Sequence, residues 1–455
     1  MTFPPHDHAA RRTRALEALG EHGALVLPAA PEIRIGRDTD VPYVPDANLL
    51  YLTGCDAPET IVVLAPRAPG GPFILFARER DEELERWTGV RESPGAMAER
   101  LGAHAAYPLA ELRERLPRLL AASETIHFPF GWGRPDVERA LLDLTAAGRR
   151  TRQRTGRGPR AIADPGAILD EMRLIKDAAE IARMRAAADV TVQAFREAAA
   201  AARSATHEWQ VHAAIEYAFR RRGASGPAFP SIVAAGSNAT VLHYTANDAR
   251  IEPNRLLLVD AGATVDHYRA DVTRTWAPTG TATAAQRDMH DVVMRAHGAA
   301  IDAIRPGATE AEVHRAALAQ LLRGMEELGL LTETADAALA AEDERLRARP
   351  SESPSDDTDK PQRPAWSRYC PHRISHWLGL EVHDVGDYAV DGRSRRLEPG
   401  MLLTLEPGLY VPTGDEHAPA ALHGIGIRVE DDVLVTSDGH EVLTAALDTG
   451  LSPIA

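Results

Sequence analysis

The chain has 455 residues, of which 44% are apolar, and a formal net charge of −15. This length favours two or three domains, and the apolar content allows a large buried interior, which excludes a chain that is disordered as a whole. The negative charge would repel a nucleic-acid backbone, so we expect no nucleic-acid partner.

Cysteine content and apolar run length bear on the compartment. Only Cys55 and Cys370 are present, which is too few for a disulfide framework and fits a reducing compartment. The start, MTFPPHDHAARRTR, has no apolar signal core, and no segment approaches the roughly 18 apolar residues that a membrane span requires. We therefore expect a cytoplasmic protein that has no membrane partner.

The first part of the chain predicts a small α/β domain. Short apolar strand candidates, GALVLP, ETIVVLAP and PFILFAR, alternate with helical stretches such as PLAELRERLPRLLAA. The run from Arg149 to Pro165 is rich in Arg and Gly and lacks an apolar period, which predicts a boundary loop. We place the N-terminal domain at residues 1–165 and a second domain at residues 170–455.

The second domain is expected to open with a long amphipathic helix. Within residues 170–202, apolar side chains recur at helical spacing at Ile181, Met184, Ala188, Val192 and Phe195. Two further helices are predicted, at HEWQVHAAIEYAFRRRG and at GATEAEVHRAALAQLLRGMEELG, which opens with a capping-box pattern.

Strand candidates lie between and after these helices. They are FPSIVAAG, RLLLVDAGATVDHYRADVTRTW, MLLTLEPGLYV and GIGIRVEDDVLVT. Residues 335–365 interrupt the pattern with a stretch that is dense in Pro, Ser and charge and cannot bury apolar surface. We predict a flexible insertion there.

Four carboxylates stand at unexpected places in the strand candidates. Asp260 ends the apolar run LLLVD, Asp271 lies in YRADVTRTW, Glu406 ends LLTLE, and Glu430 lies in GIRVEDDV. Carboxylates at or within apolar strands would lose solvation and repel one another, and divalent cations would offset both effects. The motifs VDAG and LEPG, each followed by a second acid, predict two related halves that contribute a pair of carboxylates each.

A histidine cluster accompanies these acids. The stretch PHRISHWLGLEVHD contains His372, His376 and His383, and buried imidazoles need a metal, a substrate or carboxylates as partners. Four acids and one imidazole form an oxygen-rich set that suits Mn, Co or Fe(II), with zinc as an alternative. Because four carboxylates are too many for one small ion, we expect two metals about 3.5–4 Å apart that hold a bridging hydroxide as nucleophile.

Several segments together resemble the signature segments of the Xaa-Pro aminopeptidase family, also called aminopeptidase P, within the methionine-aminopeptidase and prolidase superfamily. They are LLLVDAG, RADVTRTW, HYTAN, SHWLGLEVHDVG, LEPGMLLTLEPGLY and HGIGIRVEDDVLVT. The resemblance is dense from about Lys176 to Leu443, and the spaced order D, D, H, E, E is specific. It implies an α/β protein with a smaller N-terminal α/β domain and a catalytic domain of pita-bread fold with pseudo-twofold halves.

By this resemblance, five residues fall on metal-ligand positions. Asp271 and Glu430 would bridge the two ions, Asp260 would bind one ion, and His376 and Glu406 would bind the other. The expected cofactor is a pair of divalent ions per subunit, Mn²⁺ in the first place, with Zn²⁺, Co²⁺ or Fe²⁺ as alternatives.

The resemblance also assigns residues to the substrate. His243, His372 and His383 match the family's substrate-facing histidines, and Tyr410 and Arg428 fall where the family lines the pocket for proline. The expected substrate is a peptide with an Xaa-Pro N-terminus. His383, Glu406 and His243 are the candidate catalytic residues, with His383 hydrogen-bonded to the developing oxyanion and Glu406 carrying the proton to the proline nitrogen.

Comparison with the family pattern bears on three further positions. Trp87, in RWTGVR, resembles a tryptophan that reaches the site of a neighbouring subunit, so a homo-oligomer, either a dimer or a tetramer, is expected. Arg373 and Ile374, in PHRISH, stand where the bacterial pattern usually has Gly-Leu.

The expected activity is metal-dependent release of the N-terminal residue from peptides with proline in second position. The main alternative is prolidase, an Xaa-Pro dipeptidase with the same five ligands, which would need a cation such as Arg428 or Arg373 to hold the free carboxylate. Relatives of the fold also include metal-free binding proteins and amidino hydrolases such as creatinase. All five ligand positions are filled in this chain, which favours a metalloenzyme.

Overall fold

The computed structural model describes residues 1–131, 134–278, 281–347 and 363–452. It divides into two compact units: an N-terminal unit, Pro5–Arg173, and a C-terminal unit, Met1–Pro4 with Leu174–Ala455. Across the described residues, no helix combines the length and apolarity needed to cross a membrane.

The N-terminal unit is built on a six-stranded mixed sheet with strand order β4-β3-β2-β1-β5-β6. The strands are β1 (Gly23–Pro28), β2 (Ile61–Leu64), β3 (Phe73–Ala77), β4 (Ala105–Pro108), β5 (Thr125–His127) and β6 (Ala161–Ala163). The α-helices are α1 (His8–Leu19), α2 (Ala47–Thr53), α3 (Glu82–Thr88), α4 (Pro94–Leu101), α5 (Leu112–Leu119), α6 (Pro135–Thr155) and α7 (Gly166–Leu174), which ends at the boundary of the unit.

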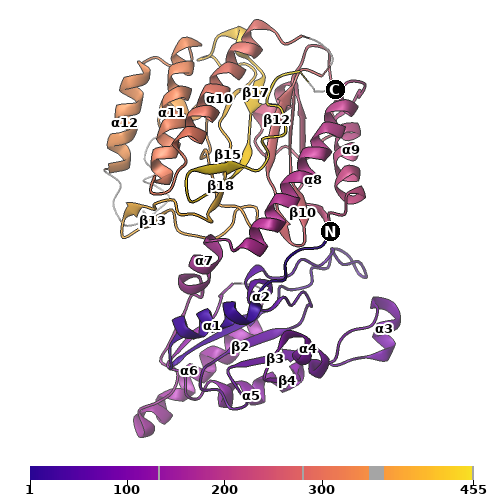
Figure 1. Ribbon diagram of the computed structural model, residues 1–455, viewed down its shortest axis with the longest axis vertical. Coiled ribbons are helices and arrows are strands. Elements are labelled where there is room, and N and C mark those ends of the chain that lie inside the picture. The colour runs from indigo at the N-terminus through magenta and orange to yellow at the C-terminus, as the bar shows by residue number, and fades with distance from the viewer. Residues whose placement is uncertain (132–133, 279–280, 348–362, 453–455) are drawn as a thin grey trace. The chain divides into compact units, whose positions relative to one another are not determined.

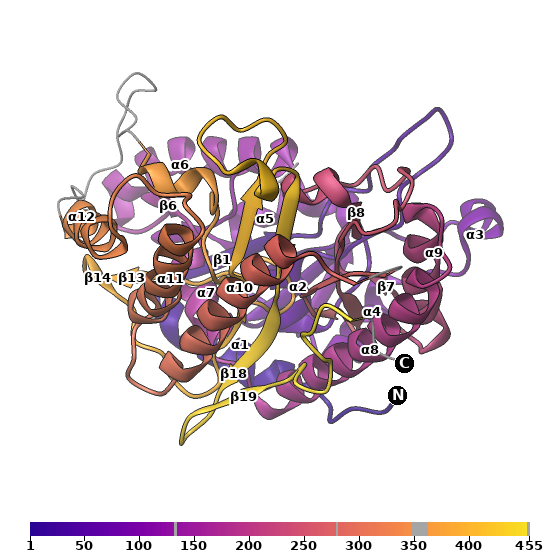
Figure 2. The same cartoon turned by 90° about the horizontal axis from the view of Figure 1, so that it is seen from above.

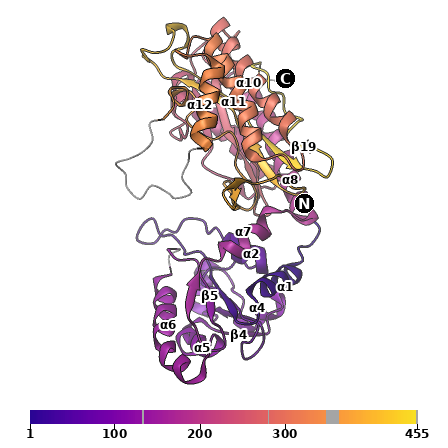
Figure 3. The same ribbon diagram turned by 90° about the vertical axis from the view of Figure 1, so that its left-hand side faces the viewer.

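Alternating side chains bury both faces of this sheet. Val26, Val63 and Phe76 lie on one face and pack with Leu116 of α5 and Leu141 of α6. Figure 3 shows α5 and α6 on one side of the sheet and α1 and α4 on the other. The three strand candidates of the sequence correspond to β1, β2 and β3.

The expected boundary loop at Arg149 to Pro165 is wrong. Helix α6 continues to Thr155, and β6 then adds a parallel strand beside β5. Arginine is a good helix former and needs no buried face, so a polar run can extend a helix that is anchored further back. The helix ends at Gly156, which adopts φ 72° and donates its N–H to the Arg152 carbonyl, 2.8 Å away.

The C-terminal unit begins with the long helix predicted from apolar spacing. After α7 (Gly166–Leu174), α8 (Ala178–Ala202) buries Met184, Ala188, Val192 and Phe195. Helix α9 (Glu208–Arg221) packs against α8, and a sheet of order β12-β9-β8 lies next to them. The strands of this half are β7 (Gly226–Pro227), β8 (Ile232–Ala235), β9 (Leu257–Ala261), β10 (Ala263–Val265), β11 (Tyr268–Arg269) and β12 (Val272–Trp276).

A second half follows with the same order of parts. Its helices are α10 (Ala284–Ala303), α11 (Glu310–Glu327), which has the expected capping box, and α12 (Ala335–Arg347). Its strands are β13 (Ala389–Val390), β14 (Arg393–Ser394), β15 (Leu402–Leu405), β16 (Gly408–Val411), β17 (Ile425–Arg428), β18 (Asp431–Val435) and β19 (His440–Val442). Figure 1 shows β12, β15, β17 and β18 between α8 and α9 on one side and α10 to α12 on the other, and Figure 2 shows the same for β18.

The predicted flexible insertion at 335–365 differs from the structure in its first part. Residues Ala335–Arg347 form α12, and Ala335 and Ala338 are buried in the apolar core that α10 and α11 share. Residues 348–362, which contain most of the Pro- and Ser-rich stretch, lie outside the described residues.

Arg274 of β12 joins the two halves. Its side chain is 1% exposed and makes five hydrogen bonds, including two to the carbonyls of Thr273 (2.9 Å) and Glu430 (2.7 Å). One of the five bonds is also an ion pair, with the buried carboxylate of Asp431 2.7 Å away. A guanidinium presents several donors in a rigid plane. Through this one side chain, the first half therefore fixes the start of β18 in the second half.

Replacing Arg274 with methionine should lower the free energy of unfolding by about 3–5 kcal/mol, because the buried Asp431 would lose a charged partner. Urea denaturation measures the change. The matched control is Arg323→Met, at an exposed position of α11, for which a change within about 0.5 kcal/mol is expected. Equal effects of the two variants would show that Arg274 does not hold the halves together.

Candidate metal centre and active site

Four strand ends bring the four predicted carboxylates to one place. Asp260 is the penultimate residue of β9, and Asp271 directly precedes β12, which pairs antiparallel with β9. Glu406 directly follows β15, and Glu430 directly precedes β18, the antiparallel partner of β15. In an antiparallel pair, the end of one strand lies beside the start of the other. Each pair therefore places one acid at the end of a strand (the leaving acid) and one at the start of its partner (the entering acid) at the same edge of the sheet.

The glycines of VDAG and LEPG allow this arrangement. A Cβ atom on Gly262 would lie 1.6 Å from the carbonyl oxygen of Ala270. One on Gly408 would lie 2.4 Å from the hydroxyl of Tyr410 and 3.0 Å from the carbonyl oxygen of Ile427 in the adjacent strand β17. Each glycine therefore lets the chain after an acid pass close to a neighbouring segment. The two motifs perform the same task in the two halves.

The halves meet at the centre of this group. The backbone N–H of Glu430 donates to the Thr273 carbonyl, 3.0 Å away, and the Thr273 hydroxyl donates to the Glu430 carboxylate at 2.8 Å. Glu430 is thereby placed beside Asp271, the entry residue of the adjacent strand. Asp271, His376 and Glu430 present ligand atoms that all lie within 4.8 Å of one another.

His376 faces three of the acids with the same ring nitrogen. Its Nε2 lies 3.5 Å from Asp271, 3.8 Å from Glu430 and 3.9 Å from Glu406. The other nitrogen, Nδ1, lies 3.1 Å from the Trp377 carbonyl, an acceptor that places the proton on Nδ1 of the neutral ring. Nε2 is therefore the nitrogen available to bind a cation.

Burial and mutual repulsion oppose ionisation of these acids. Desolvation, and then the neighbouring Asp260, raise the pKa of Asp271 well above its usual range, while desolvation and Asp271 do the same for Glu430. Desolvation raises the pKa of Glu406 to about 7. These raised pKa values mean that the protein groups around the site do not by themselves stabilise all of its carboxylates in the ionised form.

The donor set fits divalent cations. Oδ1 of Asp260 and Oδ1 of Asp271 are buried and have no hydrogen-bond partner among the described residues. Buried carboxylate oxygens are almost always bonded, so two such atoms beside an imidazole Nε2 mark a place for a cation.

Arg428 supplies one protein cation at the edge of this group. It is 4% exposed, forms an ion pair with Asp260, and donates to the hydroxyls of Tyr410 (2.9 Å) and Thr273 (3.0 Å). Although burial disfavours its charged form, Tyr410, Asp260 and Glu430 raise the pKa of Arg428. Arg428 thus connects the carboxylates to the predicted proline pocket.

The predicted substrate histidines surround the same group. His372 Nε2 lies 2.8 Å from the Tyr410 hydroxyl, and burial, with help from Arg428, lowers the pKa of His372 to about 4. The rings of His383 and His376 lie 4.3 Å apart, and desolvation and then His376 lower the pKa of His383. His243 is exposed and lies close enough to act electrostatically on both His372 and His383.

Trp87 lies on α3 of the N-terminal unit. Its side chain is 86% exposed, so it does not serve the core of that unit. Every other residue predicted for the site belongs to the C-terminal unit.

Four supporting residues were missed by the sequence analysis: Thr273, Arg274, Asp431 and Asp432. The Asp432 carboxylate accepts from the Asp271 N–H at 3.2 Å, and burial raises the pKa of Asp432. Burial opposes ionisation of Asp431 too, but Arg274 and His297 lower its pKa. The sequence signal for Asp431 and Asp432 was the run EDD, three consecutive acids at the start of an apolar strand. Alternation along a strand can place only part of such a run on a polar face, so a buried acid was to be expected.

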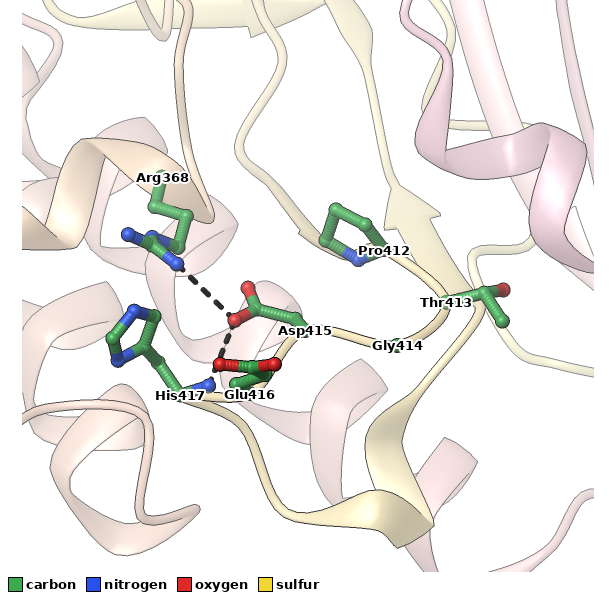
Figure 4. A pocket seen from close by; sticks show the side chains of 7 residues that line it. All are labelled: Arg368, Pro412, Thr413, Gly414, Asp415, Glu416 and His417. Atoms are coloured by element: carbon green, nitrogen blue, oxygen red, sulfur yellow. Dashed lines mark hydrogen bonds and ion pairs between the residues drawn. The ribbon is translucent and has the colours of Figure 1, made fainter.

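The C-terminal unit also contains a separate polar cavity of about 430 Å³. It is lined by Arg368 and residues 412–417, and Figure 4 shows Asp415 bonded to both Arg368 (3.2 Å) and the His417 backbone (2.9 Å). None of the predicted site residues lines it, and its Asp415 carboxylate already has partners. We therefore place the chemistry at the carboxylate group and not in this cavity.

Two family models match the chain. Residues 182–437 match metallopeptidase family M24, and residues 8–127 match the N-terminal domain of aminopeptidase P. The Xaa-Pro aminopeptidase of Escherichia coli is 34% identical over 443 residues, covering 96% of this chain and 94% of the relative. That of Haemophilus influenzae is 31% identical over 455 residues, covering 99% of this chain and 97% of the relative.

Solved structures agree with these matches. Aminopeptidase PepP of Pseudomonas aeruginosa superposes with a TM-score of 0.89 at 36% identity, covering 99% of this chain and 97% of that one. Proline aminopeptidase P II of Yersinia pestis gives 0.86 at 33% identity, covering 98% and 97%. The predicted fold class, a smaller N-terminal α/β domain followed by a catalytic domain of this family, is confirmed, and the chain belongs to metallopeptidase family M24.

Proposed function

We propose that the chain is a metal-dependent Xaa-Pro aminopeptidase that releases the N-terminal residue from peptides with proline in second position. The observation that carries this proposal is the convergence of Asp260, Asp271, His376, Glu406 and Glu430 from separate strand ends and one loop. The family and its named relatives support the same activity.

Those five residues would hold two divalent ions, with Asp271 and Glu430 shared between them. The unpartnered oxygens of Asp260 and Asp271 support this assignment, as does the raised pKa of Glu430. We propose Mn²⁺, because carboxylate-rich sets suit hard cations, with Zn²⁺, Co²⁺ and Fe²⁺ as the alternatives to test. When bound, the ions would lower the pKa of a water to supply a nucleophile and would polarise the substrate carbonyl.

The chain's own groups would bind the peptide and move the proton. His383 lies against His376 and is proposed to donate a hydrogen bond to the oxyanion that develops on the scissile carbonyl. Glu406, at the edge of the carboxylate group, is proposed to carry the proton to the proline nitrogen, which belongs to a tertiary amide and must be protonated to leave. His243 is proposed to contact the substrate from the exposed side.

Two engaged cations favour an aminopeptidase over a dipeptidase. A dipeptidase must hold the carboxylate after proline, and Arg428 and Arg373 were the candidates for that task. Arg428 is committed to Asp260, Tyr410 and Thr273 inside the protein. Arg373 is paired with Glu310 at 2.6 Å. Neither guanidinium is therefore free to close the pocket behind proline.

Other features of the proposal concern the whole chain. We propose residues 1–165 and 170–455 as its domains, a division close to that of the two compact units, whose boundary falls between Arg173 and Leu174. The exposed Trp87 supports a role at a neighbouring subunit of a dimer or tetramer. The two buried, unpaired cysteines support a reducing, cytoplasmic location.

Substrate length provides the main test. The manganese-loaded protein should cleave an Xaa-Pro-Xaa tripeptide at its first bond with a kcat/KM at least comparable to that for the Xaa-Pro dipeptide. Asp271→Asn is the control, because loss of a shared carboxylate should remove both the bound metal, measured by elemental analysis, and the activity. Hydrolysis of the dipeptide alone would replace this proposal with prolidase.

His383 should matter for turnover but not for metal binding. We expect His383→Ala to lower kcat about 10²–10³-fold, the usual effect of removing one oxyanion donor, with unchanged metal content. His417→Ala, in the separate polar cavity of Figure 4, is the matched control and should turn over normally. Loss of metal from the His383 variant would mean that His383, and not His376, is the histidine ligand of the metal.

The buried charge predicts a pH dependence for the metal-free protein. The pKa of Glu406 is about 7 when folded, against 4.5 when exposed, so between these values the folded state binds a proton that the unfolded chain releases. Stability should therefore fall as pH rises from 4.5 to 7, by up to about 3 kcal/mol from this group. Urea denaturation of chelator-treated protein measures it, and Glu406→Gln should lack this part of the slope. Parallel pH profiles for the two proteins would contradict the shift.

A further inference from the structure

The side chain of Arg373 is fixed although it is half-exposed. Its Nη2 donates to the carboxylate of Glu310, 2.6 Å away, and its guanidinium lies 4.6 Å from the ring centre of Tyr388. Glu310, the first residue of α11, is 3% exposed, and its other oxygen accepts from the Ser375 hydroxyl at 3.1 Å. A buried carboxylate needs a cation, so the pair anchors the segment 373–375 to the start of a core helix.

The backbone carbonyl of Arg373 contacts a different residue, His372. Its carbonyl lies 2.7 Å from Nδ1 of His372, while Nε2 of the same ring lies 2.8 Å from the Tyr410 hydroxyl. A carbonyl can only accept, so the neutral His372 ring carries its proton on Nδ1 and accepts on Nε2. Arg428 can only donate to the Tyr410 oxygen, at 2.9 Å, which leaves the Tyr410 proton for His372.

A competing acceptor lies nearby. The Glu406 carboxylate is 3.5 Å from the same Nδ1 of His372, so a shift of the Arg373 carbonyl would let the ring turn to Glu406. That turn would break the bond between His372 and the Tyr410 hydroxyl. The position of one carbonyl thus decides which way His372 faces.

We propose that Arg373 and Glu310 are positioning residues that hold His372 in its Nδ1–H form, directed at Tyr410, and so shape the side of the site that receives proline. The ion pair restrains the backbone of Arg373 through its own side chain, and Tyr388 supports the guanidinium from the other side. This role rests on the proposed function of the site, and it gives Arg373 a task other than binding substrate.

The kinetic test uses Arg373→Met, which keeps the aliphatic stem and removes the charge. With an Xaa-Pro-Xaa tripeptide we expect KM to rise about tenfold and kcat to change much less, because the pocket and not the reacting group is displaced. Arg373→Lys, which can still reach Glu310, should restore most of the loss, and Glu310→Gln should reproduce it. Arg393→Met, at an exposed arginine of β14, is the matched control.

A second background separates positioning from general structural damage. In His372→Ala, adding Arg373→Met should change kcat/KM by less than about twofold, because residues that act through one another are not additive. An equal loss in both backgrounds, or an unchanged KM in the single variant, would overturn the proposal.

A spectroscopic measurement tests the pair without relying on catalysis. In the full-length protein labelled with ¹⁵N-histidine, the His372 signals, assigned by their absence from His372→Ala, should show the Nδ1–H form and lose it in Arg373→Met. An unchanged tautomer would refute the inference. Absence of any Xaa-Pro hydrolysis by the wild type, together with the expected tautomer change, would refute the proposed function alone.

Discussion

Four carboxylates that share one buried place are the constraint on which this structure depends. Like charges at such distances in a poorly solvated interior repel strongly, and desolvation alone favours their protonated forms. The protein itself neutralises part of this charge, because Arg428 forms an ion pair with Asp260. Asp271 and Glu430, at the centre, have no such guanidinium at ion-pair distance among the described residues. The remaining charge is the reason that a cation is needed there.

The fold meets this constraint by using one device twice. An antiparallel strand pair places a leaving acid and an entering acid at one edge, and a glycine after the leaving acid lets the chain pass close to its neighbour. The two edges are then joined through Thr273 and Arg274, whose bonds reach Glu430 across the seam. The acids are therefore held by backbone pairing and not by loops, which gives the rigid geometry that a metal centre requires.

The central features of the site were predictable because each carries a local conflict in the sequence. Asp260, Asp271, Glu406 and Glu430 contradict the apolar strands that contain them, and helices such as α8 and α11 have an apolar period or a capping box. The helical end of α6 and the helix α12 were missed because a polar, Arg- or Ala-rich helix has little periodic signal. Asp431 and Asp432 were missed because their partners, Arg274 and the Asp271 N–H, are over 150 residues away in the chain. Long-range pairing of this kind leaves no trace in spacing.

The same network links the carboxylates to the residues of the proposed proline pocket. Asp260 pairs with Arg428, Arg428 donates to Tyr410, and Tyr410 bonds His372. A cation that bound Asp260 would compete with Arg428 for the Asp260 carboxylate. It would thereby change the hydrogen bond that Arg428 donates to Tyr410. By linkage, a peptide that ordered the pocket would change the affinity for that cation by the same factor. Metal binding and substrate binding are therefore expected to be coupled through these residues, so the choice of metal should alter substrate affinity as well as the rate of the chemical step.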